Sequence, residues 1–180
     1  MKHFNISKAH PPRTGLTIST SEKLISRNTV TYFSLGKGTD ISPETYMNHM
    51  VYIGHFGTGS FLLGKDRKEL TMHENQILIV EPDTLCGVRT EEGFVYTEIM
   101  AERSISSTID SHTVYDLNTL NGDVIRNDSL RLSLGNHISV NGEALVLYEN
   151  GNAVRLARGE TYPLDERALV LEMTEGEIND

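Results

Sequence analysis

Hydrophobic residues in this chain occur in short runs, and turn-forming residues separate the runs. We expect strands at Thr29–Leu35, Met50–Ile53, Gly59–Leu63, Gln76–Val80, Gly93–Met100, Leu130–Leu134, Glu143–Tyr148, Ala153–Leu156 and Ala168–Met173. Turns are expected at 36–38, 57–59, 64–66, 82–83 and 150–152, where glycine, proline, aspartate and asparagine gather. We interpret Gly57-Thr58-Gly59 as a hairpin turn. Because helical periodicity is scarce, the pattern predicts an all-β fold, an antiparallel sandwich or barrel.

Several of these runs are apolar at every position, so we expect both faces of the sheets to be covered. Met50 and Tyr52 alternate with Val51 and Ile53. One pair should therefore line the barrel, while the other faces outward against a partner surface. This outward apolar face predicts a homodimer.

Two parts of the chain share a pattern of strand, glycine turn and strand. The matched segments are 24–36 with 123–135, 50–57 with 144–151, and 77–80 with 169–172. Three matches in the same order favour a duplication with a shortened second copy. The expected organisation is an N-terminal arm over 1–20, a first barrel over 21–102 and a second, degenerate unit over 103–180.

The composition is that of a globular protein, with 38% hydrophobic and 23% charged residues in a chain of 180. The N-terminus lacks the apolar stretch of a signal peptide, and the single cysteine, Cys86, excludes an internal disulfide, so we expect a cytoplasmic protein. A net charge of −9 argues against nucleic acid and anionic membranes as partners. Residues 101–180 hold six basic and fourteen acidic residues, so most of this charge belongs to the second half.

Two segments resemble the motifs of the cupin family. The stretch Gly38–Tyr46, followed by Met50–Ile53 and 57–59, resembles the first motif, and Glu74–Arg89 resembles the second. The second half resembles a degenerate cupin more weakly, so the resemblance implies a small bicupin.

Metal-binding cupins hold one ion with three histidines and a glutamate. The resemblance places Glu44, Tyr46, Met50 and Cys86 at those four positions. Without imidazole, and with a thioether in place of the glutamate, this set is unusual for a transition metal. We therefore expect neither a metal nor a cofactor, while an atypical metal site remains the alternative.

The same resemblance suggests a ligand pocket in the first barrel. Its expected lining is Glu44, Tyr46, Met50, Tyr52 and Cys86. Each residue also has a simpler interpretation. Cys86 could be a small buried hydrophobe, Glu44 could be solvated in the turn after Pro43, and Met50 and Tyr52 could be ordinary core.

Two further groups of ionisable residues lie near the predicted strands. The acidic stretch that includes Glu98 is most simply a solvated face, although Glu98 could point inward. His49 and His55 are expected at the surface or at an edge.

The leading hypothesis is a metal-free cupin-like protein that binds a small molecule in the first barrel, or that acts as a structural or regulatory partner. The alternative is a cupin-type enzyme, such as an isomerase, an epimerase or a dioxygenase-like protein. In that case Glu44 or Tyr46 would transfer a proton, or an atypical metal site would operate.

Overall fold

The computed structural model describes residues 1–22, 28–137 and 139–173. The regular structure in these residues is almost entirely antiparallel β-sheet, which confirms the predicted all-β sandwich or barrel. The described helices are the single-turn α1 (Ile6–Ala9) and the 3-10 helix η1 (Leu117–Thr119). No helix in these ranges is long and apolar enough to cross a membrane.

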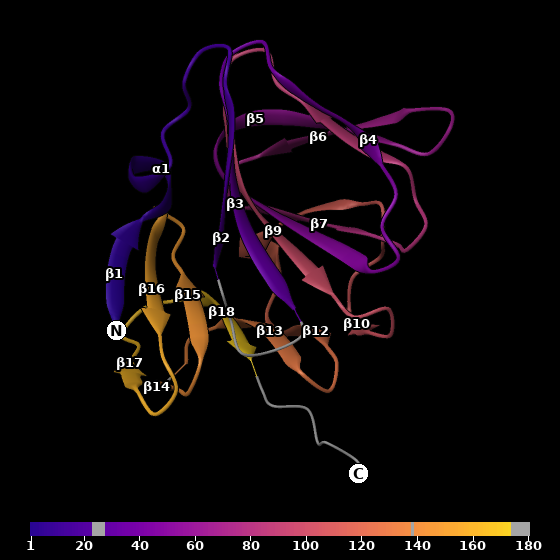
Figure 1. Ribbon diagram of the computed structural model, residues 1–180. Coiled ribbons are helices and arrows are strands. Elements are labelled where there is room, and N and C mark those ends of the chain that lie inside the picture. The colour runs from indigo at the N-terminus through magenta and orange to yellow at the C-terminus, as the bar shows by residue number, and fades with distance from the viewer. Residues whose placement is uncertain (23–27, 138, 174–180) are drawn as a thin grey trace.

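The first sheet curls into a barrel with two walls, and β5 belongs to both of them. One wall has the strand order β11-β7-β5-β9-β3-β2, and the other contains β4, β8, β5 and β6. The bounds are β2 (Thr17–Glu22), β3 (Thr29–Leu35), β4 (Asp40–Glu44), β5 (His49–Leu63), β6 (Lys68–His73), β7 (Gln76–Val80), β8 (Cys86–Arg89), β9 (Phe94–Ala101) and β11 (Val114–Asp116). Figure 1 shows this barrel in the upper part of the molecule.

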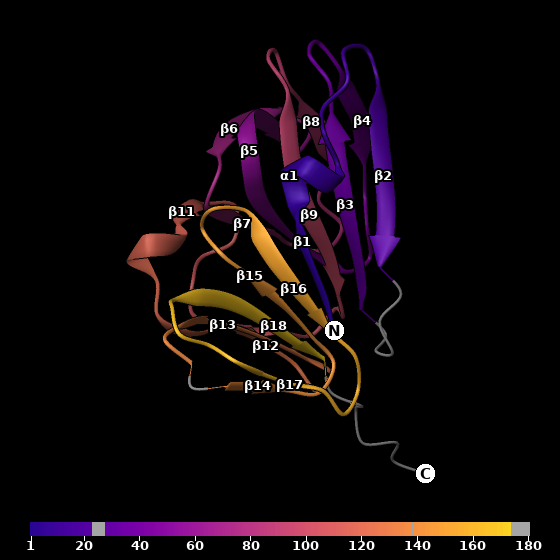
Figure 2. The same cartoon turned by 90° about the vertical axis from the view of Figure 1, so that its left-hand side faces the viewer.

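The second sheet lies below the barrel in Figures 1 and 2 and has the order β1-β16-β15-β18-β13-β12-β10. Its strands are β1 (Lys2–Asn5), β10 (Ser106–Ser107), β12 (Gly122–Arg126), β13 (Leu130–Gly135), β15 (Ala144–Leu147), β16 (Asn152–Leu156) and β18 (Ala168–Met173). A short ribbon of β14 (Ser139–Asn141) and β17 (Thr161–Pro163) accompanies it.

The buried hydrophobic side chains form three clusters. The inter-sheet core lies between the two sheets and includes Val51, Ile53, Ile79, Leu132, Leu145 and Leu171. The barrel core fills the first barrel and consists of Leu35, Met50, Tyr52, Phe61, Leu63, Met72, Leu78, Val80, Cys86, Val88, Phe94 and Tyr96. The outer core covers the other face of the second sheet and consists of Val140, Ala144, Val146, Val154, Leu156, Leu164, Ala168 and Val170. The expectation that both faces of the sheets are covered is therefore confirmed.

The inter-sheet core corrects one interpretation of the sequence. Val51 and Ile53 do face away from the barrel interior, but they pack against the second sheet of the same chain. The apolar face that suggested a second copy is thus covered internally, because the second half of the chain supplies the covering sheet. The homodimer stays a prediction without this support.

Strand β5 is continuous over fifteen residues, so the predicted hairpin turn at Gly57-Thr58-Gly59 is wrong. The strand bends at a bulge between Gly54 and Phe56 and then crosses from one wall to the other. At Gly57 φ is +70°, and a Cβ there would overlap the carbonyl oxygen of Gly93. Glycine supplies both the left-handed backbone and the space that this crossing needs.

The two sheets share one order of strands. The order β7-β5-β9-β3-β2 in the first matches β16-β15-β18-β13-β12 in the second, and all neighbouring pairs are antiparallel. In this comparison β13 corresponds to β3 and β15 corresponds to β5, as in the sequence repeat. However, β18 corresponds to β9 and not to β7, so the alignment of 77–80 with 169–172 is wrong. Runs of aliphatic residues such as these resemble any central strand.

The N-terminal arm extends over both sheets. β1 pairs with β16 at the edge of the second sheet, and Ile6 is buried in the inter-sheet core. β2 then pairs with β3 of the first sheet. In the opposite direction, β11 comes from the second half of the chain and pairs with β7 of the first sheet. Each sheet thus receives an edge strand from the other half.

Candidate functional site

A carboxyl group lies on the inner face of the first barrel. Glu98 on β9 is opposite Tyr52 of β5 and Thr31 of β3 in the strand register. Because side chains alternate along a strand, Tyr96 lies on the same face as Glu98. Tyr52 and Tyr96 both belong to the barrel core. Glu98 therefore belongs to the barrel interior, and its main interpretation as part of a solvated face is wrong.

The surroundings of Glu98 change its acidity. Burial and the nearby charge of Glu44 raise the pKa of Glu98 to about 7, while a hydrogen bond from the Tyr52 hydroxyl acts in the opposite direction. A carboxyl group with such a pKa takes up and releases a proton near neutral pH, which is a common property of functional sites.

Two buried phenols adjoin this carboxyl group. Tyr52 is 2% exposed and Tyr96 is fully buried. Burial raises the pKa of both hydroxyls well above the ordinary value, so both remain protonated. The Tyr52 hydroxyl is hydrogen-bonded to Glu98 and to Cys86. The Tyr96 hydroxyl, by contrast, has no hydrogen-bond partner among the described residues.

Aromatic rings form the floor beneath these polar groups. The Tyr96 ring stacks on Phe94 and on Phe33, with centroid distances of 5.1 and 5.2 Å. The Phe61 ring lies 4.7 Å from that of Tyr52. These rings belong to the barrel core or pack against it, on the same face of the sheet as Glu98.

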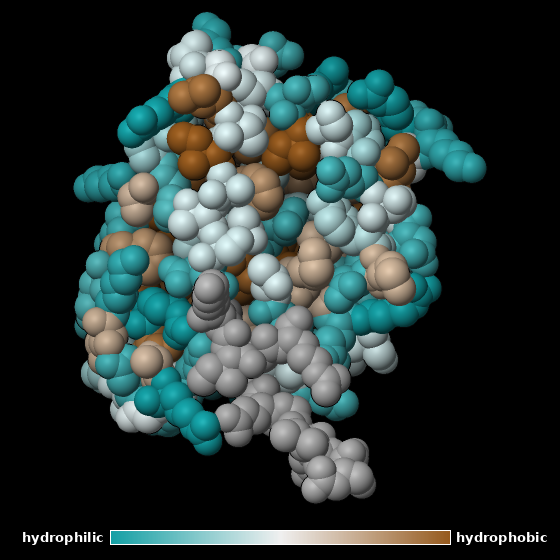
Figure 3. Space-filling view, in the orientation of Figure 1, coloured by the Kyte–Doolittle hydropathy of each residue, from teal (hydrophilic) through white to brown (hydrophobic). Residues whose placement is uncertain are grey.

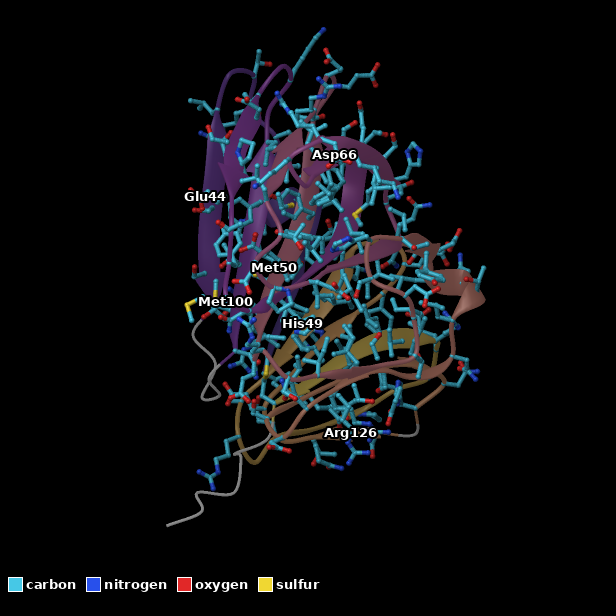
Figure 4. The ribbon with its side chains drawn as sticks, turned by 90° about the vertical axis from the view of Figure 1, so that its right-hand side faces the viewer. Glu44, His49, Met50, Asp66, Met100 and Arg126 are labelled. Atoms are coloured by element: carbon cyan, nitrogen blue, oxygen red, sulfur yellow. The ribbon has the colours of Figure 1, made fainter. Side chains whose placement is uncertain are left out.

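Glu44 and Tyr46 lie at the rim of the barrel. Glu44 ends β4, is in register with Cys86 of β8 and is exposed. Figure 4 shows it at the outer edge of the barrel. The Tyr46 hydroxyl donates a hydrogen bond of 2.7 Å to Oε2 of Glu44. Tyr46 is partly buried against the barrel core, and burial together with this bond raises its pKa.

Met50, Tyr52 and Cys86 are interior residues, with exposures of 1, 2 and 5%. Figure 4 shows Met50 beside Met100, its partner on β9. Burial raises the pKa of the Cys86 thiol to about 11, so the thiol stays protonated and is a weak nucleophile. The five residues singled out in the sequence therefore surround one end of one barrel, with Glu44 at its solvent side.

The two histidines of β5 differ from expectation. The Nε2 atom of His55 lies 2.6 Å from Oγ1 of Thr97. Burial lowers the pKa of His55 to about 3, so the ring is neutral over the physiological range. His55, expected at the surface or an edge, is therefore half-buried. His49 is partly buried as well.

The donor atoms at the four positions that cupins use for a metal do not fit a divalent cation. Tyr46 and Cys86 are held protonated, and Met50 offers a thioether. Glu44 supplies a hard oxygen ligand, but it is exposed at the rim. Within the described ranges, no three His, Cys, Asp or Glu side chains are grouped so that they could hold a metal ion.

Comparisons with known proteins concern mainly the fold. No protein-family model and no curated protein matches the chain. The "Cupin 2 conserved barrel domain protein" from Leptotrichia buccalis is similar over 95% of this chain and 89% of its own, with 12% identity and a TM-score of 0.64.

Two further solved structures match about half of the chain. A cupin superfamily protein from Desulfitobacterium hafniense covers 55% of this chain and is matched over 89% of its own, with 16% identity and a TM-score of 0.51. A conserved protein of unknown function from Streptococcus pyogenes covers 56% and is matched over 87%, with 14% identity and a TM-score of 0.51. At these identities the likeness concerns the fold alone.

Proposed function

Starting from the cupin fold that this chain has, we propose that the first barrel binds a small polar molecule at the end where Glu98 and Tyr96 lie. The observation that carries the proposal is the Tyr96 hydroxyl, which is fully buried and has no hydrogen-bond partner among the described residues. A buried hydroxyl without a hydrogen-bond partner lowers the free energy of unfolding by about 1–3 kcal/mol. A bound hydroxyl or carbonyl oxygen would accept the bond that Tyr96 lacks.

The neighbouring groups define the kind of ligand. Tyr96 can donate to the ligand, and Glu98 can accept from it when ionised or donate when protonated. The aromatic floor favours an apolar ring or carbon skeleton facing it. A small molecule with hydroxyl or carbonyl groups on one side would use each of these groups, as is usual in ligand pockets.

The test uses Tyr96→Phe, which removes the hydroxyl and keeps the ring. Tyr32→Phe is the matched control, since Tyr32 is equally buried but faces the inter-sheet core. We expect saturation-transfer NMR with a set of monosaccharides, hydroxy acids and amides to detect ligands whose signals weaken about tenfold in Tyr96→Phe and persist in Tyr32→Phe. Ligands that bind both variants equally, or a set in which nothing binds, would contradict the proposal.

The same substitution has a second expected effect. Without ligand, Tyr96→Phe should raise the free energy of unfolding by about 1 kcal/mol, because the unpaired hydroxyl is gone. Higher stability combined with weaker binding distinguishes a ligand-binding hydroxyl from a structural one.

A second candidate function is proton transfer, as in an isomerase or an epimerase. The pKa of Glu98, about 7, favours it, because an acid–base group works best near its own pKa. In this function Glu98 is the acid–base group, and Glu44 is not, because Glu44 is exposed at the rim. Wild type should then exchange a carbon-bound proton of a bound ligand with deuterium from D₂O, and Glu98→Gln should not. Binding without exchange would refute this function and leave the binding proposal intact.

We further propose that the second sheet is a shortened second cupin unit, so that the chain is a bicupin. The shared strand order of the two sheets supports this organisation. The similarity to the Leptotrichia buccalis protein over nearly the whole chain agrees with it.

A further inference from the structure

A second cleft lies on the second sheet, away from the first barrel. It has a volume of about 410 Å³ and borders β1, β16 and the segment around β17. These strands lie together in the lower left of Figure 1, whereas β4, which ends at Glu44, lies at the upper right. The volume is within the range of pockets for small molecules.

Aromatic side chains form part of the wall. The hydroxyls of Tyr148 and Tyr162 are 3.3 Å apart, and the His3 ring packs edge-on against Tyr162 with a centroid distance of 5.6 Å. Both tyrosines are partly buried and pack on the outer core. Each keeps part of its surface open to the cleft, and the face of an aromatic ring attracts cations.

Two carboxylates complete the wall. Asp165 and Glu166 follow β17, are exposed, and form no ion pair with another described residue. Burial, the hydrogen bond to Tyr162 and the charges of Glu166 and Asp165 together raise the pKa of Tyr148. The two carboxylates therefore lie close enough to the Tyr148 hydroxyl for their charges to influence its pKa.

Lys2 of β1 holds its Nζ atom 5.3 Å from the centroid of the Phe4 ring, whereas two arginines near the cleft are directed elsewhere. Arg155 pairs with Glu143 at 2.7 Å. Arg167 donates hydrogen bonds to the carbonyl oxygens of Leu117 and Leu120. Neither arginine therefore pairs with the carboxylates of the cleft. Both carboxylates lie in the half of the chain that carries most of the excess of acidic residues.

We propose that this cleft binds a small organic ammonium ion, held by the carboxylates of Asp165 and Glu166 and by the rings of Tyr148 and Tyr162. The carboxylates repel anions, and a neutral molecule would gain no charge–charge attraction from them. An alkylammonium ion uses both features, because its charge faces the carboxylates and its carbon atoms face the rings.

Choline is the probe, and 3,3-dimethyl-1-butanol is its neutral isostere. We expect choline to shift the tyrosine ring signals of Tyr148 and Tyr162 in NMR titrations and to bind at least tenfold more tightly than the alcohol. Raising sodium chloride from 0.05 to 0.5 M should weaken choline binding and leave the alcohol unaffected. Equal affinity for the two probes would overturn the proposal.

The variants separate this site from general negative charge. Asp165→Asn with Glu166→Gln keeps the shape of the side chains and should weaken choline binding about tenfold. Glu91→Gln with Glu92→Gln is the matched control, since these acids are also adjacent and exposed but lie in the first barrel. An equal loss in both double variants would overturn the proposal. If the first double variant did not fold, the salt titration of the wild type would still decide.

Discussion

Replacing Glu98 by glutamine should change how the stability of the protein depends on pH. The pKa of Glu98 is about 7 in the folded protein, against about 4.5 for the free side chain. Between these values the folded state keeps the proton that the unfolded state has lost. The free energy of unfolding therefore falls as pH rises from about 4.5 to 7. A glutamine has no proton to lose, so the variant lacks this decline.

The magnitude follows from the width of the interval. Between pH 5 and pH 7 the wild type loses about 2 kcal/mol of stability through Glu98, because the group is partly titrated at both ends of this interval. His55 acts in the opposite direction, because its folded pKa of about 3 lies below the ordinary 6.5. Its contribution is present above about pH 6.5 and is lost on acidification toward pH 3. The two effects oppose each other between pH 4.5 and 6.5, so the wild-type profile alone would hide both.

A difference between variants removes the effect of His55. Urea unfolding of wild type and Glu98→Gln is followed by circular dichroism at pH 5 and pH 8, since the chain has no tryptophan. The stability of the variant relative to wild type should increase by about 2.5 kcal/mol from pH 5 to pH 8. The exposed carboxylate in Glu92→Gln serves as control and should show almost no change. A difference below about 0.5 kcal/mol for Glu98→Gln would refute the placement of this carboxyl in the barrel interior.

Three further predictions concern the strand crossing, the thiol and the edge of the first sheet. Gly57→Ala should lower the free energy of unfolding by about 2 kcal/mol or more, because the backbone at Gly57 is left-handed and the carbonyl oxygen of Gly93 occupies the position of the added Cβ. A urea unfolding curve equal to that of the wild type would contradict this prediction. At pH 8 the Cys86 thiol should react with a disulfide reagent about a hundredfold more slowly in the native than in the urea-unfolded protein; rates within tenfold of each other would argue against its burial. The edge strand β2 exposes Ile18, and the preceding Leu16 is also exposed, so we expect two copies of the chain to pair along this edge. Light scattering at micromolar concentration should then give twice the chain mass of 20.1 kDa, and Ile18→Lys should give a monomer. A monomeric wild type would disprove the dimer. Figure 3 shows hydrophobic side chains in the upper part of that view, over the first barrel.

The hydrophobic pattern predicted the central strands well. Three of the expected ranges, Thr29–Leu35, Gln76–Val80 and Ala168–Met173, coincide with β3, β7 and β18. These strands are buried on both faces, so their aliphatic runs begin and end with the strand. Short or polar strands such as β4 and β2 were missed, because their side chains are largely exposed and carry no such pattern.

The candidate site was found in part. Alternation from Met50 to Tyr52 correctly indicated interior residues, and Cys86 followed from the resemblance. Glu98 lies in the same alternation as Phe94 and Tyr96, but a single acid in a strand is normally assigned to solvent because burying its charge is costly. The compensation comes from a retained proton and from Tyr52 on another strand, and neither can be inferred from local sequence.

The placement of β1 has a consequence for how the protein is made. Lys2 pairs with Arg155, and the backbone N–H of Ile6 donates to the carbonyl of Gly151. During synthesis β1 therefore leaves the ribosome long before β16, the strand with which it pairs. Contacts between such distant parts of a chain form slowly, because a long loop has to close. Nascent chains that stop before residue 150 would leave Phe4 and Ile6 uncovered, which makes them candidates for capture by chaperones during synthesis.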